Sequence, residues 1–330
     1  MQRQFRLGGG VARRAANLRG QSIIEYVLII AIIGLVIVFA GPGVAGAIRN
    51  QFNLVGNTVN NGTTGGVEGG GTSGGGSTGA DSATVQAAIA KDAKDWTLDE
   101  QKAVAEDIAA KGEASPAYAK AKAAMDAGTK FSMKLTDGQT LEYKIIGINH
   151  DDLADGSGKA GLTFLTTSTT ISSRMNATDT NAGGWGKSEL RGKMNSGEIW
   201  NLMPSDFQSK VKSVKKLTNN VGGGSANKNA AVTATSDKLF LLSYSEIVPT
   251  SYWASSYPWT SNEGTQYEAF KGKVTNNYSG NDCLKIGDYW WERSAYPNGS
   301  NYFLNASSNG DPSNNSRATD SLCVCPAFSF

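Results

Sequence analysis

The chain has 330 residues, of which 39% are hydrophobic and 18% are charged, so it can bury one or two ordinary cores and is not globally disordered. Its single histidine and three cysteines weigh against zinc clusters and against most hydrolases. Five arginines and no acidic residue occur among the first twenty positions, and the remainder has 26 basic against 29 acidic residues, which argues against a basic surface for nucleic acid.

A basic leader and an apolar segment begin the chain. We take residues 1–20 as the leader and residues 21–55 as a hydrophobic helix, because 21–40 read QSIIEYVLIIAIIGLVIVFA and the fourteen residues from Val27 to Ala40 carry no charge. About 20 helical residues span the roughly 30 Å of a bilayer core. The arginines of the leader favour a cytoplasmic N-terminus. The pattern therefore predicts one membrane crossing, with the chain beyond Arg49 outside the cell.

Gly20 and Glu25 give this segment a more specific meaning. An ionised Glu25 inside an apolar segment costs several kcal/mol unless it finds a partner. The stretch GQSIIEY at 20–26 resembles the processing motif of Flp pilins, the type IVb pilins of tight-adherence (Tad) systems. The resemblance implies that a prepilin peptidase cuts between Gly20 and Gln21, and that Glu25 and Tyr26 serve assembly. The new ammonium on Gln21 would then neutralise Glu25 of a neighbouring subunit as the helices stack.

The resemblance covers about forty residues and leaves the role of the subunit open. Flp pilins are usually tiny, whereas this chain continues for over 250 residues, so it would be either the bulk subunit or a minor, decorated one. TadE-like pseudopilins begin in a similar way. The stretch GPGVAG at 41–46 would also suit an ordinary cleaved secretory signal.

A Gly-rich linker and an Ala- and Lys-rich stretch follow the helix. Residues 56–79 contain eleven glycines in twenty-four positions, which predicts a flexible coil whose ends lie on the order of 25–30 Å apart. Residues 80–128 are expected to form a helical spacer of two or three short helices, broken near Gly112 and Pro116. Thr97 stands where the second helix should begin.

Alternating apolar and polar segments predict a single mixed domain over residues 129–330. One helix should begin after Ser188, and another should open at Pro204, with Phe207, Val211 and Val214 on one face. The expected strands are KFSMKL (130–135), LEYKIIGIN (141–149), LTFLTT (162–167), KLFLLSY (238–244), NYFLNAS (301–307) and LCVCPAF (322–328). The predicted fold class is α+β with antiparallel strands, preceded by a single N-terminal transmembrane or assembly helix.

Five blocks in this domain resemble an uncharacterised domain family found in secreted or surface proteins of Gram-positive bacteria. The blocks are IGINHDD (146–152), GGWGKSELRGKMN (183–195), DKLFLLSYSEI (237–247), WWERS (290–294) and VCPAF (324–328). They span about two hundred residues in the order of the family. Relatives often carry an arginine where this chain has Cys325. The domain also has a likeness to C-type-lectin-like and formylglycine-enzyme-like folds.

The predicted orientation places the cysteines in an oxidising environment. Cys283 is then expected to pair with Cys323 or Cys325. Alternation along a strand sends Cys323 and Cys325 to opposite faces, so these two should not pair with each other. The remaining thiol would be buried or would link subunits.

Aromatic residues concentrated within forty positions offer either a ligand surface or a core. They are Tyr252, Trp253, Tyr257, Trp259, Tyr289, Trp290 and Trp291. Exposed rings stack on sugar faces or anchor protein partners. Adjacent Trp290 and Trp291 on a strand must point opposite ways, so at least one belongs to the core. The candidates for ligand binding are Trp253 and Trp259, in a loop-like stretch, and Trp290.

No catalytic or metal site emerges from the sequence. The Asn- and Asp-rich loops 276–282 and 309–320 could supply oxygen ligands to calcium, but their spacing matches no defined calcium loop and turn chemistry accounts for them. His150, Asp151 and Asp152 invite a metal or acid–base role, yet a turn after the strand is the simpler interpretation. We expect no cofactor and no enzymatic activity.

These features predict a surface protein that assembles through its N-terminus. The precursor would lie in the cytoplasmic membrane, meet the prepilin peptidase and other pilin subunits, and end in an extracellular pilus or fimbrium. Its C-terminal domain would be displayed for adhesion to a host or neighbouring-cell ligand. Two alternatives stay open: a membrane-anchored enzyme or sensor that uses the helix as an anchor, and a minor pseudopilin that primes assembly.

Overall fold

The structure is a computed structural model that describes residues 82–330, which belong to one compact unit. The leader, the apolar segment and the Gly-rich linker lie outside the described residues, and so do the predicted cleavage and assembly positions Gly20, Gln21, Glu25 and Tyr26. No helix within 82–330 combines the length and the apolar character needed to cross a membrane.

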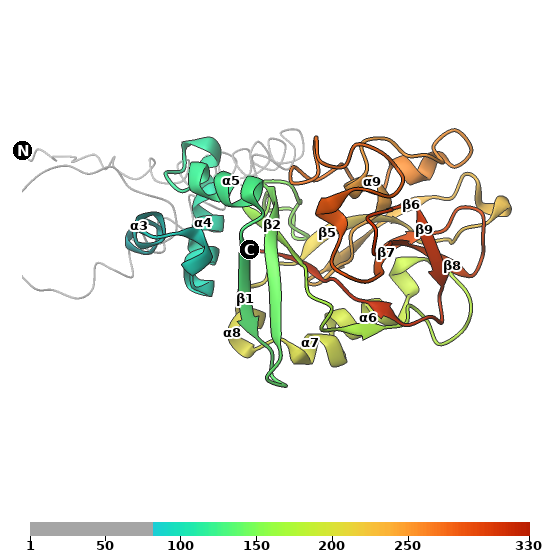
Figure 1. The fold of residues 1–330 in the computed structure, drawn as a ribbon, viewed down its shortest axis with the longest axis horizontal. Coiled ribbons are helices and arrows are strands. Elements are labelled where there is room, and N and C mark those ends of the chain that lie inside the picture. Colours follow the sequence, from blue (N-terminus) through green and yellow to red (C-terminus); the bar gives the residue numbers. More distant parts are fainter. Residues whose placement is uncertain (1–81) are drawn as a thin grey trace, which may run out of the picture. The chain divides into compact units, whose positions relative to one another are not determined.

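Three helices begin the described chain and lie together at one end of it (Figure 1). They are α3 (Ser82–Ala90), α4 (Leu98–Lys111) and α5 (Tyr118–Ala127). Thr97 starts α4 through a capping box: its hydroxyl accepts a hydrogen bond from the Glu100 backbone, and the Glu100 carboxylate accepts one from the Thr97 backbone. The predicted break near Gly112 is confirmed, because α4 ends there.

The first sheet stands beside these helices. Its strands are β1 (Lys130–Lys134), β2 (Thr140–Ile148), β3 (Leu162–Thr166) and β11 (Ala327–Ser329), in that order and antiparallel throughout. β11 comes from the far end of the sequence, and its Phe328 meets the rings of Tyr143 and Phe164 at 5.2 Å between centroids. An aromatic core therefore joins the C-terminal strand β11 to β2 and β3.

The helices share this core rather than standing apart from it. The Trp96 ring stacks on Phe131 of β1 at 6.2 Å, and the Tyr143 hydroxyl donates a 3.1 Å hydrogen bond to the Gln101 side chain of α4. Both contacts are buried. Residues 82–128 are thus part of the domain, which corrects the expectation of a spacer that ends at residue 128.

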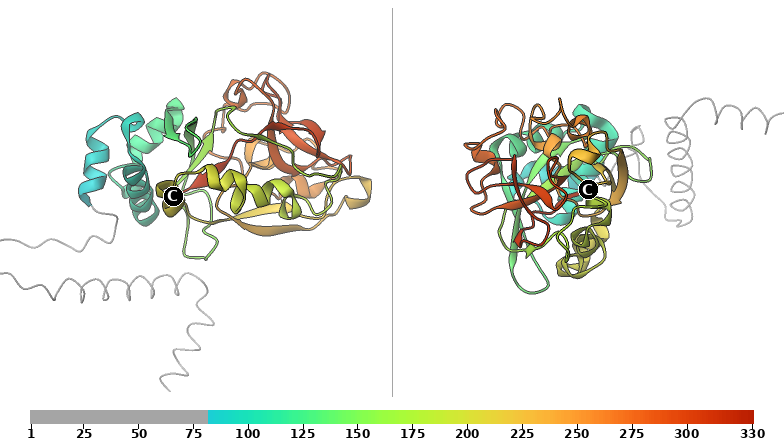
Figure 2. Two further views of the ribbon diagram at one scale, coloured as in Figure 1. Left: turned by 90° about the horizontal axis from the view of Figure 1, so that it is seen from below. Right: turned by 90° about the vertical axis from the view of Figure 1, so that its right-hand side faces the viewer.

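A second sheet and a hairpin form the other end of the domain (Figure 2). The second sheet has the order β4 (Ser172–Ser173), β10 (Leu322–Cys323), β7 (Trp290–Ala295), β8 (Tyr302–Ala306) and β9 (Asn314–Arg317). Only the β10–β7 pair is parallel. The antiparallel hairpin joins β5 (Val214–Asn219) to β6 (Val232–Asp237). The predicted α+β class with antiparallel strands is confirmed for the C-terminal part.

Short helices connect these strands. The α-helices are α6 (Glu189–Asn195), α7 (Glu198–Leu202), α8 (Ser205–Lys210) and α9 (Tyr244–Ile247). The 3₁₀ turns are Ala93–Asp95, Gly112–Ala114, Trp185–Lys187, Ser225–Asn227, Pro258–Ser261 and Asp282–Leu284. As predicted, the Ser188 side chain caps α6 and α8 starts directly after Pro204.

Three predicted elements are wrong. The single strand expected over 322–328 is divided between β10 and β11, which belong to different sheets. The stretch 238–244 is not a strand: its apolar side chains are fully buried, but only Phe240 forms a bridge, exchanging two hydrogen bonds with Ala327. The segment crosses the core between the two sheets, where side-chain packing stabilises it in place of a ladder of backbone hydrogen bonds. Val214 does not continue the helix after Pro204, because α8 ends at Lys210 and Val214 begins β5.

Candidate functional site

A group of buried charged side chains lies where the hairpin, α9 and β7 meet. We call it the ionic cluster, and it consists of Asp151, Lys216, Glu246, Tyr267 and Arg293. All five residues are at most 4% exposed. Charges are rarely placed so deep unless they are paired, so the contacts within this group decide what it can do.

Lys216 is the centre of the ionic cluster. In β5 the side chains alternate, with Val214, Lys216 and Thr218 buried and Lys215 and Leu217 exposed, which turns the ammonium inward. Its Nζ lies 2.6 Å from Asp151 Oδ1 and 2.6 Å from Glu246 Oε1. The Tyr267 hydroxyl is 3.0 Å away, and the ammonium stands 4.3 Å from the centre of the Phe240 ring.

Asp151 accepts hydrogen bonds on both carboxylate oxygens. The Tyr267 hydroxyl lies 3.0 Å from Oδ1 and 2.8 Å from Oδ2, and Thr163 Oγ1 donates to Oδ2 at 2.6 Å. Burial by itself would raise the pKa of Asp151, but the charge of Lys216, the neighbouring His150 and the hydrogen bonds from Lys216 and Thr163 together outweigh it and lower that pKa to about 2. The resting carboxyl is therefore ionised.

Glu246 connects Lys216 to a second cation. Its carboxylate accepts from the two terminal nitrogens of Arg293 at 2.5 and 3.0 Å, and it also closes a capping box at the start of α9 through the Ser243 backbone N–H at 3.0 Å. Burial opposes the charge, yet Arg293 and Lys216 together hold the pKa of Glu246 below its ordinary value. The ionic cluster thus contains two carboxylates and two cations, and it is neutral.

Two more buried carboxyls border the cluster. Glu263 accepts from Ser294 Oγ at 2.5 Å and from the Asn219 backbone at 2.8 Å, and burial raises its pKa to about 7. Glu292 is fully buried, and within residues 82–330 neither of its carboxylate oxygens has a hydrogen-bond partner. Burial and the neighbouring Glu263 raise the pKa of Glu292 well above its ordinary value.

A cavity of about 280 Å³ opens onto the ionic cluster. Asp151, Lys216 and Glu246 form part of its wall together with Gly264 and Thr265. His150 also lines it, stacked on the Tyr267 ring at 4.0 Å and with its Nδ1 3.1 Å from the Glu268 carboxylate. The cavity is therefore where the ionic cluster comes nearest to the surface.

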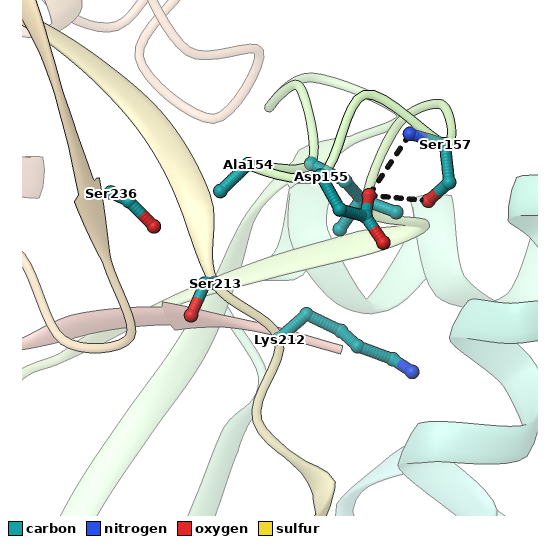
Figure 3. Close-up of a pocket in the computed structure, with 7 residues that line it drawn as sticks. Ala154, Asp155, Ser157, Lys212, Ser213 and Ser236 are labelled. Atoms are coloured by element: carbon teal, nitrogen blue, oxygen red, sulfur yellow. Dashed lines mark hydrogen bonds between the residues drawn. The ribbon is translucent and has the colours of Figure 1, made fainter.

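A second cavity, of about 390 Å³, lies between the loop after β2 and the start of the hairpin (Figure 3). Asp155 lies in its wall, where it accepts hydrogen bonds from the backbone and the hydroxyl of Ser157 at 2.9 and 2.6 Å. Those contacts stabilise the local turn. Lys212, Ser213 and Ser236 are the other polar residues of the wall, and the cavity holds no buried ion pair comparable to the ionic cluster.

The tryptophans proposed for ligand binding are buried, which corrects that expectation. Trp290 and Trp259 are 1% and 2% exposed and Trp253 is 9% exposed, because all three fill the core around the second sheet. The most exposed rings nearby are Tyr252 and Tyr278, each 59% exposed and with ring centres 6.2 Å apart. Sequence spacing did not tell which rings of this region face outward.

The predicted disulfide is absent. Cys283, Cys323 and Cys325 are all free thiols in the structure. The Cys323 thiol lies 3.7 Å from the Asp288 carboxylate, and burial raises the pKa of Cys325 far above its ordinary value. The expected pairing of Cys283 with Cys323 or Cys325 is therefore not formed in this structure.

The polar loops are organised by turns. The Asn281 side-chain amide donates to the carbonyls of Asn276, Tyr278 and Gly310, which ties loop 276–282 to the loop that contains Gly310. Asp311 Oδ1 accepts from the Ser313 backbone at 2.8 Å. Within residues 82–330, no three His, Cys, Asp or Glu side chains are grouped so as to hold a metal ion.

Asp151 is a residue of the ionic cluster whose burial the sequence did not reveal. The turn expected after β2 accounts for Asp152, which pairs with Lys159 at 3.1 Å, but Asp151 points into the interior. The sequence analysis did not predict strand β5. In that strand the side chains alternate, so the burial of Val214 implies the burial of Lys216, and a buried ammonium needs a carboxylate partner.

Comparison with known proteins places the C-terminal half in a family. No curated protein and no solved structure matches the chain. The match to the family begins just before β3, although β1 and β2 belong to the same sheet and the folded unit therefore extends further toward the N-terminus. Because residues 160–330, just over half of the chain, match the family described as a domain of unknown function (DUF6273), the chain belongs to that family.

Proposed function

We propose that the chain is a pilin or pilin-like subunit of the Flp (type IVb, Tad) kind, which assembles through its N-terminal helix and displays the domain of residues 82–330. The observation that carries the proposal is Glu25, an acidic residue five positions after Gly20 in an otherwise apolar segment. A static membrane anchor has no use for that charge, whereas a cleaved subunit acquires a new ammonium at Gln21 that can neutralise it.

The organisation of the rest of the chain suits display. Residues 56–79 supply a Gly-rich tether, and the described domain begins at α3 with its own aromatic core. Assembly through the N-terminal helices would therefore impose few structural constraints on the domain. The precursor would lie in the cytoplasmic membrane until prepilin peptidase removes the leader, and the mature subunit would join other pilin subunits in an extracellular filament.

N-terminal sequencing of the protein in shed surface material tests the processing step. We expect the mature chain to start at Gln21. A start near Val44 or Ala47 would indicate an ordinary secreted protein, and an intact Met1 would indicate a permanent anchor; either result overturns the proposal.

A substitution at Glu25 tests assembly separately from export. Glu25→Ala should abolish incorporation into filaments, while the protein still reaches the membrane, because the Gln21 ammonium loses its partner. Glu68→Ala is the matched control, since it removes the same charge from the linker and should assemble normally. Normal filaments from Glu25→Ala would favour the membrane-anchored enzyme or sensor, and filaments that merely become fewer would favour a minor pseudopilin.

For the ligand-binding part of the proposal, we assign the contact surface to Tyr252 and Tyr278. These rings are exposed and lie edge to face with their centres 6.2 Å apart, and the Tyr252 ring also meets the Trp253 ring edge to face at 5.6 Å. Such amphipathic rings suit a sugar face or an apolar protein contact. The double variant Tyr252→Ala/Tyr278→Ala should lose cell adhesion, whereas Tyr289→Ala, an exposed tyrosine outside this pair, should retain it.

A further inference from the structure

Asp151, Lys216 and Glu246 are arranged as two reactants and a proton carrier. Lys216 Nζ touches the carboxylate of Asp151 and that of Glu246, each at 2.6 Å, and the three side chains are 2–3% exposed. We propose that Lys216 and Asp151 condense into an intramolecular isopeptide bond, with Glu246 transferring protons. The inference concerns the domain itself and does not depend on its assembly into a pilus.

The bonds that form and break in this reaction balance without any added reagent. Nζ of Lys216 attacks Cγ of Asp151, so one C–N bond forms and one C–O bond of the carboxyl breaks. The –NH₃⁺ and –COO⁻ groups become –NH–CO–, and the departing oxygen leaves with two of the ammonium protons as one water molecule. Glu246 takes one proton from the ammonium, which frees the Nζ lone pair for the attack, and passes it to the leaving oxygen. It then carries the second proton from the nitrogen of the intermediate to the same oxygen and ends unchanged. No oxidant, reductant or cofactor takes part.

Hydrogen-bond donors stand where negative charge would grow. In the tetrahedral intermediate the Asp151 oxygens carry that charge, and the Tyr267 hydroxyl and Thr163 Oγ1 already donate to them at 2.6–3.0 Å. Preorganised donors in a buried site stabilise such an intermediate far more than water does. Holding amine and carboxyl in contact also removes the entropic barrier of bringing them together.

The charge balance of the cluster favours the product. Before the reaction two carboxylates face two cations, and afterwards Glu246 still faces Arg293 at 2.5 Å. Condensation therefore removes two buried charges and leaves no charge unpaired, so the desolvation cost of the Asp151–Lys216 pair disappears. The 280 Å³ cavity beside the three residues gives the released water a way out.

The bond would join distant parts of the domain. Residues 151 and 216 are 65 positions apart, and the chain between them contains β3, β4 and the helices α6, α7 and α8. A covalent link of this kind constrains the unfolded chain as a disulfide does, but reducing agents do not break it. A displayed surface domain with three free thiols would gain permanent strength from it.

Peptide mass spectrometry of the full-length protein, unfolded and digested with trypsin, tests the bond directly. We expect one linked peptide that contains both Asp151 and Lys216, lighter than the sum of its two linear parts by one water, about 18 Da. Finding only the two linear peptides in digests of the folded wild-type protein overturns the proposal, and this result needs no variant.

Three variants separate the roles. Lys216→Arg should yield only linear peptides, and Glu246→Gln should lower the linked fraction at least tenfold although both reactants remain. Asp151→Asn should still link, losing ammonia, about 17 Da, in place of water, so that its linked peptide has the wild-type mass. Lys215→Arg, the exposed neighbour in β5, is the matched control and should link fully. Full linkage in Glu246→Gln would refute the proton-carrier role.

Discussion

Gly161 lies against the backbone of Ala105, so that a Cβ at position 161 would stand 1.8 Å from the Ala105 carbonyl oxygen. Gly161 precedes β3 and Ala105 is in the middle of α4. Nearby, the Asn149 side-chain amide donates to the Ile108 carbonyl at 3.2 Å. Helix and sheet therefore approach at backbone distance, which only a residue without a side chain allows.

Gly161→Ala should destabilise the domain strongly. The added methyl group has to push α4 away from the sheet and open the core that Trp96 and Phe131 share, and we expect a loss of about 3 kcal/mol in the free energy of unfolding. Urea unfolding followed by tryptophan fluorescence measures it. Gly192→Ala is the control, because position 192 lies in α6 with open space around it and should be neutral or slightly stabilising.

Thr97→Ala should weaken the same region in a milder way. The variant removes the hydroxyl that accepts from the Glu100 backbone at 3.2 Å and leaves the start of α4 without a cap, at a cost of about 1 kcal/mol. Thr97→Ser keeps the hydroxyl and should stay within a few tenths of a kcal/mol of wild type. Equal unfolding midpoints for the alanine and serine variants would contradict the role of the capping box.

The regular parts of this fold could be predicted from sequence because local patterns determine them. Strands β1 and β2 show apolar alternation, and Thr97 and Ser188 mark helix starts through their own hydroxyls. The segment 238–244 has the same composition as a strand but runs alone through the core. Composition reports burial, whereas pairing depends on which distant segment lies alongside.

The ionic cluster could not be predicted for the same reason. Asp151, Glu246 and Arg293 come from three separate stretches, and each looks locally like a turn, a capping or a surface residue. Only the tertiary fold brings them to Lys216. The burial of Trp253 and Trp259 likewise depends on the second sheet and not on their loop-like surroundings.

Titration of thiols should find three free cysteines. Protein unfolded without reductant should react at Cys283, Cys323 and Cys325, since the structure holds all three as thiols. In the folded protein Cys325 should stay unmodified by iodoacetamide, because burial raises its pKa and closes access. The variant Cys283→Ser should lower the count to two. A single reactive thiol in unfolded wild type would instead show that two of the three cysteines are bonded to each other.

Glu263 should make the domain less stable as the pH rises toward neutrality. Burial raises its pKa to about 7 in the folded state, against an ordinary value of 4.5. Between these two values the folded protein keeps a proton that the unfolded chain releases, so the free energy of unfolding falls with rising pH, by about 3 kcal/mol at the upper limit. The stabilisation from this group is complete below pH 4.5 and lost above pH 7.

Glu263→Gln should flatten that part of the pH profile, because the amide mimics the protonated acid and accepts from the Asn219 backbone as before. Urea unfolding at half-unit steps from pH 4.5 to 7.5 provides the comparison with wild type. Glu292, whose pKa is raised by burial and by the neighbouring Glu263, has the same sign, so the difference between the two curves reports Glu263 together with its coupling to Glu292. The exposed Glu198→Gln serves as the control for loss of charge and should follow the wild-type slope. Parallel curves for wild type and Glu263→Gln would mean that Glu263 is ionised in the folded domain throughout this range. The Ser294 hydroxyl and the nearby Arg293 would then stabilise its negative charge.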